Sequence, residues 1–182
     1  ADTHARDNVT IAELALDADG KFLAFRVDTI ANLGAYLGTM TPHSPTNNLG
    51  GLAGVYTTPA IYTAVSGRFT NTGWTGPYRG AGRPEASLAI EKAIDRAAAE
   101  MGIDRAEIRR RNLIPADAIP YQTGLIFNYD SGDFPKVMEQ SLELADYGGF
   151  EERRKEAAAR GKLRGMGIAY AIEQAAAPIE ET

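Results

Sequence analysis

The sequence predicts an α+β fold, in which an antiparallel pair of strands comes first and helices pack against it. Two alternating segments, 8–16 and 22–30, are separated by Asp17-Ala18-Asp19-Gly20, which is typical of a hairpin turn. A long helical pattern covers 84–101, and more helical patterns follow it. This order favours α+β over a series of βαβ units. We expect residues 1–182 to form a single domain.

The first strand places Val9 and Ile11 on one side, and residues 33–37 are a candidate extension of the sheet that the hairpin begins. The stretch 39–64 holds three prolines among glycines and asparagines, so it predicts an irregular connection. A short strand is expected around Val65, just before the segment that leads to a glycine-rich loop.

The glycine-rich loop, 76–82, runs directly into the best-defined helix. Pro84 suits the first helical position and Gly102 the carboxyl end. One face of the helix is apolar and should lie in the core: Ala86, Ala89, Ile90, Ala93, Ile94, Ala97 and Met101. Glycines let a ligand approach the backbone, and a helix amino end carries unpaired N–H groups, so this junction could hold an anion or an electron-rich cofactor. The alternative interpretation is a tight structural loop, because neither the Rossmann nor the P-loop pattern is present.

Asp104 and Glu107 predict a capping box for the next helix. Its last turn carries Arg109, Arg110 and Arg111, which we interpret as solvated residues near the negative helix end rather than as an anion patch. Three glutamates of the long helix are interpreted as helix-face carboxylates: Glu85, Glu91 and Glu100.

The remainder predicts an irregular stretch, 116–133, followed by two helices and a strand. Asp133 should cap a helix over 134–145. A charged, alanine-rich helix is expected over 150–160, and alternation predicts a strand over 163–172.

Composition excludes several classes of function. The formal charge of −5 argues against general affinity for nucleic acid or an anionic membrane. With no cysteine and only His4 and His43, no metal site is predicted within these residues. We find no signal peptide and no apolar run long enough for a membrane span. The polar opening without a starting Met leads us to expect a central fragment of a longer, cytoplasmic protein.

The motif YRGAGRPEA, followed by IEKAIDRAAAEMGIDRAEIRRRNLIP, resembles the molybdopterin-binding large subunit of the xanthine dehydrogenase, aldehyde oxidase and carbon monoxide dehydrogenase family. The resemblance extends over about 7–173. It implies an α+β subunit around a molybdopterin-type molybdenum cofactor. It also implies an oxidoreductase that hydroxylates a small-molecule substrate and passes electrons to iron–sulfur and FAD subunits or domains.

The resemblance assigns Tyr78, Arg79, Gly80, Ala81 and Gly82 to the cofactor site, with the backbone N–H of Arg79 near the molybdenum. Carbon monoxide dehydrogenases carry a copper-binding cysteine at the position of Gly80, and several other relatives carry a stacking phenylalanine at the position of Ala81. Gly80 therefore argues against carbon monoxide oxidation, and Ala81 leaves the substrate open. His4 falls loosely where some relatives have a substrate-facing arginine, but a surface histidine is the preferred interpretation.

The family's catalytic glutamate and its other glycine-rich cofactor segment match no stretch here, so no catalytic residue is assigned. We expect these residues to contribute one wall of the cofactor site and to be inactive alone. A non-catalytic binding or interaction domain that keeps the family scaffold is the alternative.

Overall fold

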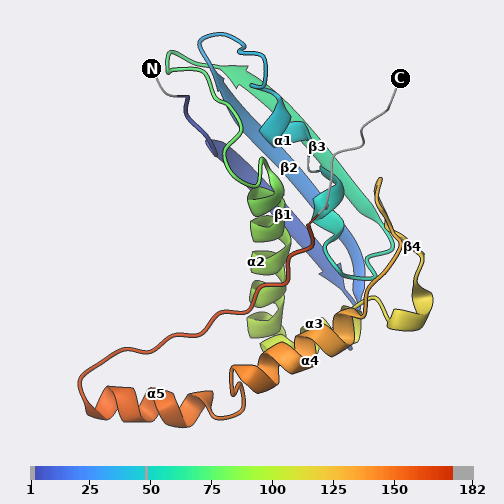
Figure 1. Cartoon of the computed structure of the whole chain (residues 1–182), viewed down its shortest axis with the longest axis vertical. Helices are drawn as coiled ribbons and strands as arrows, with labels where there is room; N and C mark the ends of the chain where they lie inside the picture. The colour runs from blue at the N-terminus through green and yellow to red at the C-terminus, as the bar shows by residue number, and fades with distance from the viewer. Residues whose placement is uncertain (1–2, 48, 174–182) are drawn as a thin grey trace.

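The computed structural model describes residues 3–47 and 49–173, and it confirms the α+β fold (Figure 1). Its main sheet has the order β1-β2-β3, with β1 spanning Asn8–Leu16, β2 spanning Phe22–Gly34 and β3 spanning Ile61–Phe69. The first pair is antiparallel and the second is parallel, so the sheet is mixed.

The predicted hairpin is confirmed, and its turn is held by one carboxylate. Asp17 Oδ1 accepts hydrogen bonds of 2.9 Å from the backbone N–H groups of both Asp19 and Lys21. β2 then runs past the predicted end at residue 30 and stops at Gly34. The proposed extension over 33–37 is therefore largely wrong, because the chain leaves the sheet at Gly34.

The prediction of an irregular stretch over 39–64 was wrong. It contains helix α1 (His43–Asn47), the 3₁₀ helix η1 (Leu49–Ala53) and the first part of β3. Val55 and Tyr56 are buried in the core and anchor this connection. A parallel partner needs a crossover connection, and the local pattern of prolines and glycines does not reveal that long-range pairing.

The long helix α2 spans Arg83–Met101, and its predicted caps are confirmed: Pro84 lies in the first turn and Gly102 adopts the left-handed conformation at the end. α2 packs across β1 and on η1. Its buried residues include most of the predicted face: Ala86, Ile90, Glu91, Ile94, Ala97 and Ala98.

α3 (Arg105–Asn112) begins at its predicted cap, since Asp104 Oδ1 accepts from the N–H groups of Ala106 (2.8 Å) and Glu107 (3.0 Å). The later helices α4 (Phe134–Leu144) and α5 (Phe150–Ala159) are also confirmed. Between α3 and α4, the expected irregular stretch contains small regular elements: η2 (Ala116–Ala118), β4 (Tyr121–Gln122) and β5 (Asn128–Tyr129).

The strand predicted over 163–172 was wrong. This segment leaves α5 and runs back past α2 as an extended chain without a strand partner (Figure 1). The side chains of Arg105 and Arg109 donate to the carbonyl groups of Met166 and Ile168, at 3.4 and 3.3 Å. Hydrogen bonds from these arginine side chains thus hold segment 163–172, in place of the backbone hydrogen bonds of a neighbouring strand that the alternating pattern suggested.

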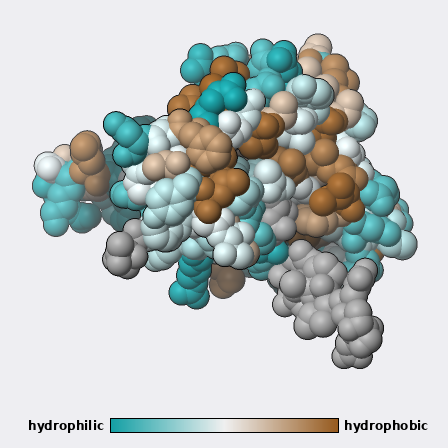
Figure 2. Space-filling view, turned by 90° about the horizontal axis from the view of Figure 1, so that it is seen from above, coloured by the Kyte–Doolittle hydropathy of each residue, from teal (hydrophilic) through white to brown (hydrophobic). Residues whose placement is uncertain are grey.

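Only one face of the main sheet is covered by α2. On the opposite face, the register of the strands places the exposed side chains of Val9 and Ile30 opposite each other, with Ile11 two residues further along β1. The exposed ring of Tyr62 lies further along the sheet, opposite Arg26. Brown apolar residues also lie among hydrophilic ones on the surface seen in Figure 2. No helix in the described part of the chain is long and apolar enough to cross a membrane.

Candidate functional site

The predicted site residues form a compact loop at the amino end of α2. Gly80, Ala81 and Gly82 have positive φ angles of 93°, 45° and 100°. Two backbone hydrogen bonds close the turns: the Ala81 N–H donates to the Tyr78 carbonyl at 2.6 Å, and the Arg83 N–H donates to the Gly80 carbonyl at 2.9 Å. The loop therefore has a defined conformation that depends on residues able to adopt positive φ.

Gly80 is required for two reasons. Its φ of 93° is rarely adopted by residues with side chains, and a Cβ atom there would lie 2.6 Å from Cδ and Cγ of Pro84. The absence of a side chain at Gly80 consequently leaves the space that the ring of Pro84 occupies at the start of α2. Any side chain at this position would displace the loop, the helix start or both.

The loop presents hydrogen-bond donors. Within the described residues, the N–H groups of Arg79, Gly80 and Gly82 have no acceptor, although Gly82 is buried. Fixed amides of this kind stabilise negative charge or an electron-rich ligand without reorganising. The side chains of Tyr78 and Arg79 are exposed beside them.

The chain before the loop is anchored to the end of β2. A Cβ atom on Gly34 would lie 2.4 Å from the Gly73 carbonyl oxygen and from Trp74 Cα, so only glycine permits this close approach. The Thr75 hydroxyl donates to the Asn32 carbonyl at 3.0 Å. The loop is therefore mounted on the sheet as well as on α2.

The amino-terminal segment also reaches this region. The His4 N–H donates to the Trp74 carbonyl at 3.2 Å, and the Gly76 N–H donates to the His4 carbonyl at 2.8 Å. The side chain of His4 is exposed, in agreement with its interpretation as a surface histidine. Arg6 contacts the loop directly, and we did not predict it, because no local pattern links residues so far apart in sequence.

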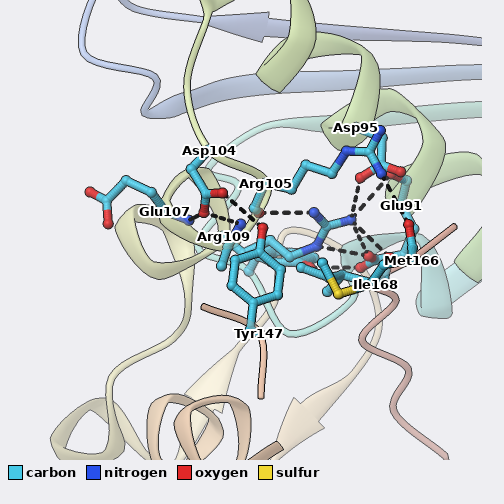
Figure 3. A network of polar contacts seen from close by, with 11 residues as sticks. Glu91, Asp95, Asp104, Arg105, Glu107, Arg109, Tyr147, Met166 and Ile168 are labelled. Carbon is cyan, nitrogen blue, oxygen red and sulfur yellow. Dashed lines mark hydrogen bonds and ion pairs between the residues drawn. The ribbon is translucent and has the colours of Figure 1, made fainter. Parts of the chain in front are cut away.

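A second polar cluster lies inside the molecule, at the contact between α2 and α3 (Figure 3). Arg109 has no exposed side-chain surface, and it donates to Glu91 at 2.7 Å and to Asp95 at 3.1 Å. The hydroxyl of the buried Tyr56 donates to the other oxygen of Glu91 at 2.6 Å. Arg109 also donates to the Arg105 and Ile168 carbonyl groups, so this cluster joins α2, α3 and the extended carboxyl-terminal segment.

These contacts correct one interpretation and refine another. Arg109 is neither solvated nor part of an anion patch. Glu91 does lie on a helix face, but that face is buried, because Glu91 is only 5% exposed. Burial is the largest single effect and opposes a charge on Arg109. The negative charge of Glu91, its hydrogen bond and the further charges around it, Asp95 among them, together outweigh burial and raise the pKa of the guanidinium. Burial, followed by the charge of Glu91, raises the pKa of Tyr56, so its hydroxyl remains a donor. No local pattern in the sequence distinguishes Arg109 from Arg110, since both follow Ala106 at helical spacing.

The two neighbouring arginines do lie at the surface, as predicted. Arg110 pairs with Glu139 at 2.5 Å and Arg111 pairs with Glu107 at 2.9 Å, all partly exposed. No group of His, Asp or Glu side chains in the described residues is arranged to hold a metal ion.

The loop and the helix it precedes can now be compared with known proteins. Residues 1–113 match the family described as the molybdopterin cofactor-binding domain. The chain belongs to this family. The resemblance found in the sequence is thus confirmed, and with it the molybdopterin-type cofactor of the family.

Individual relatives agree with this assignment. The chain is 35% identical to the 6-hydroxypseudooxynicotine dehydrogenase complex subunit gamma of Paenarthrobacter nicotinovorans, covering 99% of this chain and 23% of that protein. It is also 35% identical to the carbon monoxide dehydrogenase large chain of Afipia carboxidovorans, covering 93% of this chain and 22% of the relative.

A solved structure shows the same fold. Quinoline 2-oxidoreductase from Pseudomonas putida 86 matches 87% of this chain with a TM-score of 0.81 and 33% sequence identity, over 20% of its own length. The chain thus spans about a fifth of the length of such relatives.

Proposed function

We propose that this chain is part of a molybdenum hydroxylase and contributes one wall of its cofactor site through the loop from Tyr78 to Gly82. When bound, the molybdenum–pterin group supplies the redox chemistry of hydroxylation with oxygen from water. The observation that carries the proposal is the set of loop amides, those of Arg79, Gly80 and Gly82, that have no acceptor within the described residues. Donors fixed in this way suit the electron-rich ligands of such a cofactor.

Within that site, each part of the loop has a separate task. The N–H groups of Arg79 and Gly80 donate toward the cofactor, and the turns that end at Arg83 keep them in place. The ring of Tyr78 is exposed beside these amides and contacts the guanidinium of Arg6. No residue of this chain is proposed as the catalytic base.

The substrate is a small molecule whose identity depends on parts of the site beyond the loop. Gly80 replaces the copper-binding cysteine expected of a carbon monoxide dehydrogenase, so we do not propose that reaction. Ala81 offers a methyl group where an aromatic ring would stack on a substrate. One relative is the nicotine 6-hydroxylase large subunit of Paenarthrobacter nicotinovorans, so nitrogen heterocycles are the first class of substrate to assay.

The partners we propose are the rest of the molybdenum subunit and subunits or domains that carry iron–sulfur clusters and FAD. Names such as "complex subunit gamma" and "large chain" support a multi-subunit enzyme. We place this enzyme in the cytoplasm and propose no partnership with nucleic acid or membrane, in keeping with the net charge of −5.

The test is Gly80→Val in the complete enzyme, with Gly102→Val as the matched control. Both glycines have positive φ, at 93° and 66°, but a Cβ atom on Gly102 would contact nothing within 4 Å. Both variants should lose roughly 1 kcal/mol or more of stability from backbone strain. Only Gly80→Val should also lose most of its molybdenum and turnover. Arg79→Ala should lose less molybdenum than Gly80→Val, because the proposed contact uses the main chain.

The alternative function is a non-catalytic binding or interaction domain on the same scaffold. It predicts that Gly80→Val and Gly102→Val differ little in metal content. A Gly80→Val enzyme with full molybdenum and normal turnover would remove the loop from the cofactor site.

A further inference from the structure

Arg6 contacts the loop at two points and the first turn of α2 at a third, although it precedes β1 and lies far from the loop in sequence. Its Nη2 donates a hydrogen bond to the carbonyl oxygen of Arg79. Its guanidinium carbon lies 4.9 Å from the centroid of the Tyr78 ring, within the range of a cation–π contact. Its Nε lies 3.6 Å from Glu85 Oε1, in the first turn of α2. One side chain thereby joins the start of the loop to the start of the helix.

The hydrogen bond to the Arg79 carbonyl has a consequence for the adjacent amide. The carbonyl of Arg79 and the N–H of Gly80 belong to one peptide unit, which is planar and trans, so the two groups point in opposite directions. When Arg6 holds the carbonyl, it also fixes the direction of the Gly80 N–H. That N–H has no acceptor within the described residues, and it is one of the donors assigned above to the cofactor.

The contact with Glu85 gives Arg6 a second role, which is to compensate the charge of this carboxylate. Both carboxylate oxygens of Glu85 are inaccessible to solvent and accept no hydrogen bond within the described residues. The guanidinium of Arg6 is the cation that faces them, at 3.6 Å. A desolvated carboxylate is costly without a nearby positive charge, so Arg6 also stabilises the first turn of α2.

Arg6 is itself held in position by the backbone on both sides. His4 exchanges hydrogen bonds with Trp74 and Gly76, and the Asp7 carbonyl accepts from the Asn32 N–H at 3.0 Å. Between these anchors, Arg6 adopts a φ of 58°, which turns the chain at this residue. A side chain carried on an anchored backbone can hold its partner in a defined orientation.

We propose that Arg6 is a positioning residue for the cofactor site: it orients the Arg79–Gly80 peptide so that the Gly80 N–H faces the cofactor. This inference rests on the proposed function of the loop. Arg6 acts through the peptide and does not itself touch the cofactor. Loss of such supporting contacts around metal centres typically costs on the order of 10- to 100-fold in affinity or activity.

The experiment compares Arg6→Met with Arg26→Met in the complete enzyme. Arg26 is a matched control, because it also combines ion pairs with Glu13 and Asp28 and a cation–π contact with Tyr62, at the far side of the same sheet from the loop. We expect Arg6→Met to lose molybdenum and pterin by about tenfold per folded protein, and Arg26→Met to keep both. Metal analysis and pterin fluorescence measure the content, and melting temperature is recorded on the same samples.

The double variant Arg6→Met with Glu85→Gln separates orientation from charge neutralisation. It removes the unpaired carboxylate, so its melting temperature should return toward that of the unmodified enzyme, and it also covers the case in which Arg6→Met alone does not fold. If Arg6 orients the peptide, the double variant stays deficient in cofactor. A double variant with full molybdenum and pterin content would overturn the proposal and leave Arg6 as a counter-ion of Glu85.

The two proposals fail in different ways. If Gly80→Val loses cofactor and the double variant does not, only the role of Arg6 is wrong. If Gly80→Val retains full cofactor, the proposed function of the loop is wrong and the role of Arg6 is wrong with it.

Discussion

Arg109, Arg110 and Arg111 are adjacent in sequence, and their environments differ sharply. Arg109 is fully buried between two carboxylates, whereas Arg110 and Arg111 make partly exposed pairs. The residue types alone predict three similar arginines. What distinguishes them is the rotation of α3 against α2, which is a tertiary property. The turn at Gly80 and Gly82, by contrast, was predictable from the sequence, because positive φ strongly favours glycine at these two positions.

Removing Arg109 should destabilise the fold strongly. Arg109→Met leaves Glu91 and Asp95 without their cation, and breaking a buried pair in this way costs about 3–5 kcal/mol. Arg110→Met is the control from the same helix and should cost no more than about 1 kcal/mol, because its pair is exposed. Urea denaturation of the two variants measures the difference. Equal losses would contradict the burial of Arg109.

At the scale of elements, the helix ends were predicted well and two longer segments were not. Asp104, Asp133 and Gly102 act at the ends where the sequence placed them, because capping involves residues only a few positions apart. The crossover over 39–64 and the segment 163–172 depend instead on partners distant in sequence. An alternating pattern predicts a strand, but it does not show whether a neighbouring strand is present to pair with it.

The cap of α3 should give the fold a specific pH dependence. Partial burial alone would raise the pKa of Asp104, but hydrogen bonds from the Tyr147 hydroxyl and the first helical amides outweigh it and lower the pKa below 3.8. A depressed folded-state pKa means that the carboxylate stabilises the fold above its unfolded-state pKa and loses this effect as the pH falls through the folded value.

Asp104→Ala should therefore lower the free energy of unfolding by about 1 kcal/mol at pH 7. The difference between the two proteins should shrink as the pH falls below about 4, because the unmodified carboxyl group becomes protonated. Denaturation curves collected at several pH values test this. A difference that stays constant down to the lowest pH would show that the charge of Asp104 is not involved.

At the scale of the whole molecule, the sequence predicted the α+β class, the hairpin and the family, but not the parallel pairing of β3 with β2. The loop site depends on that larger arrangement. It is mounted on the end of β2, on α2 and on the segment before β1, three parts of the chain that meet only in the folded protein. The glycine pattern could therefore locate the loop, whereas Arg6 and Gly34 became visible as its supports only in the structure.

Residues 1–182 purified alone should hold no molybdenum and show no hydroxylase activity. The loop supplies amides on one side only, and the relatives that share the fold are more than four times as long as this chain. Metal analysis of the purified chain, with the complete enzyme as the positive control, tests the expectation. Stoichiometric molybdenum and pterin in the isolated chain would show that these residues form the whole site.

The most direct test of the central claim is a crystal structure of the complete enzyme with its cofactor bound. The measured quantity is the distance from the backbone nitrogen atoms of Arg79 and Gly80 to the nearest cofactor atom. We predict that at least one nitrogen lies at hydrogen-bond distance, about 3 Å, from an oxygen or sulfur atom of the cofactor. A cofactor bound elsewhere, with both amides facing solvent or other protein groups, would contradict the assignment of this loop to the site.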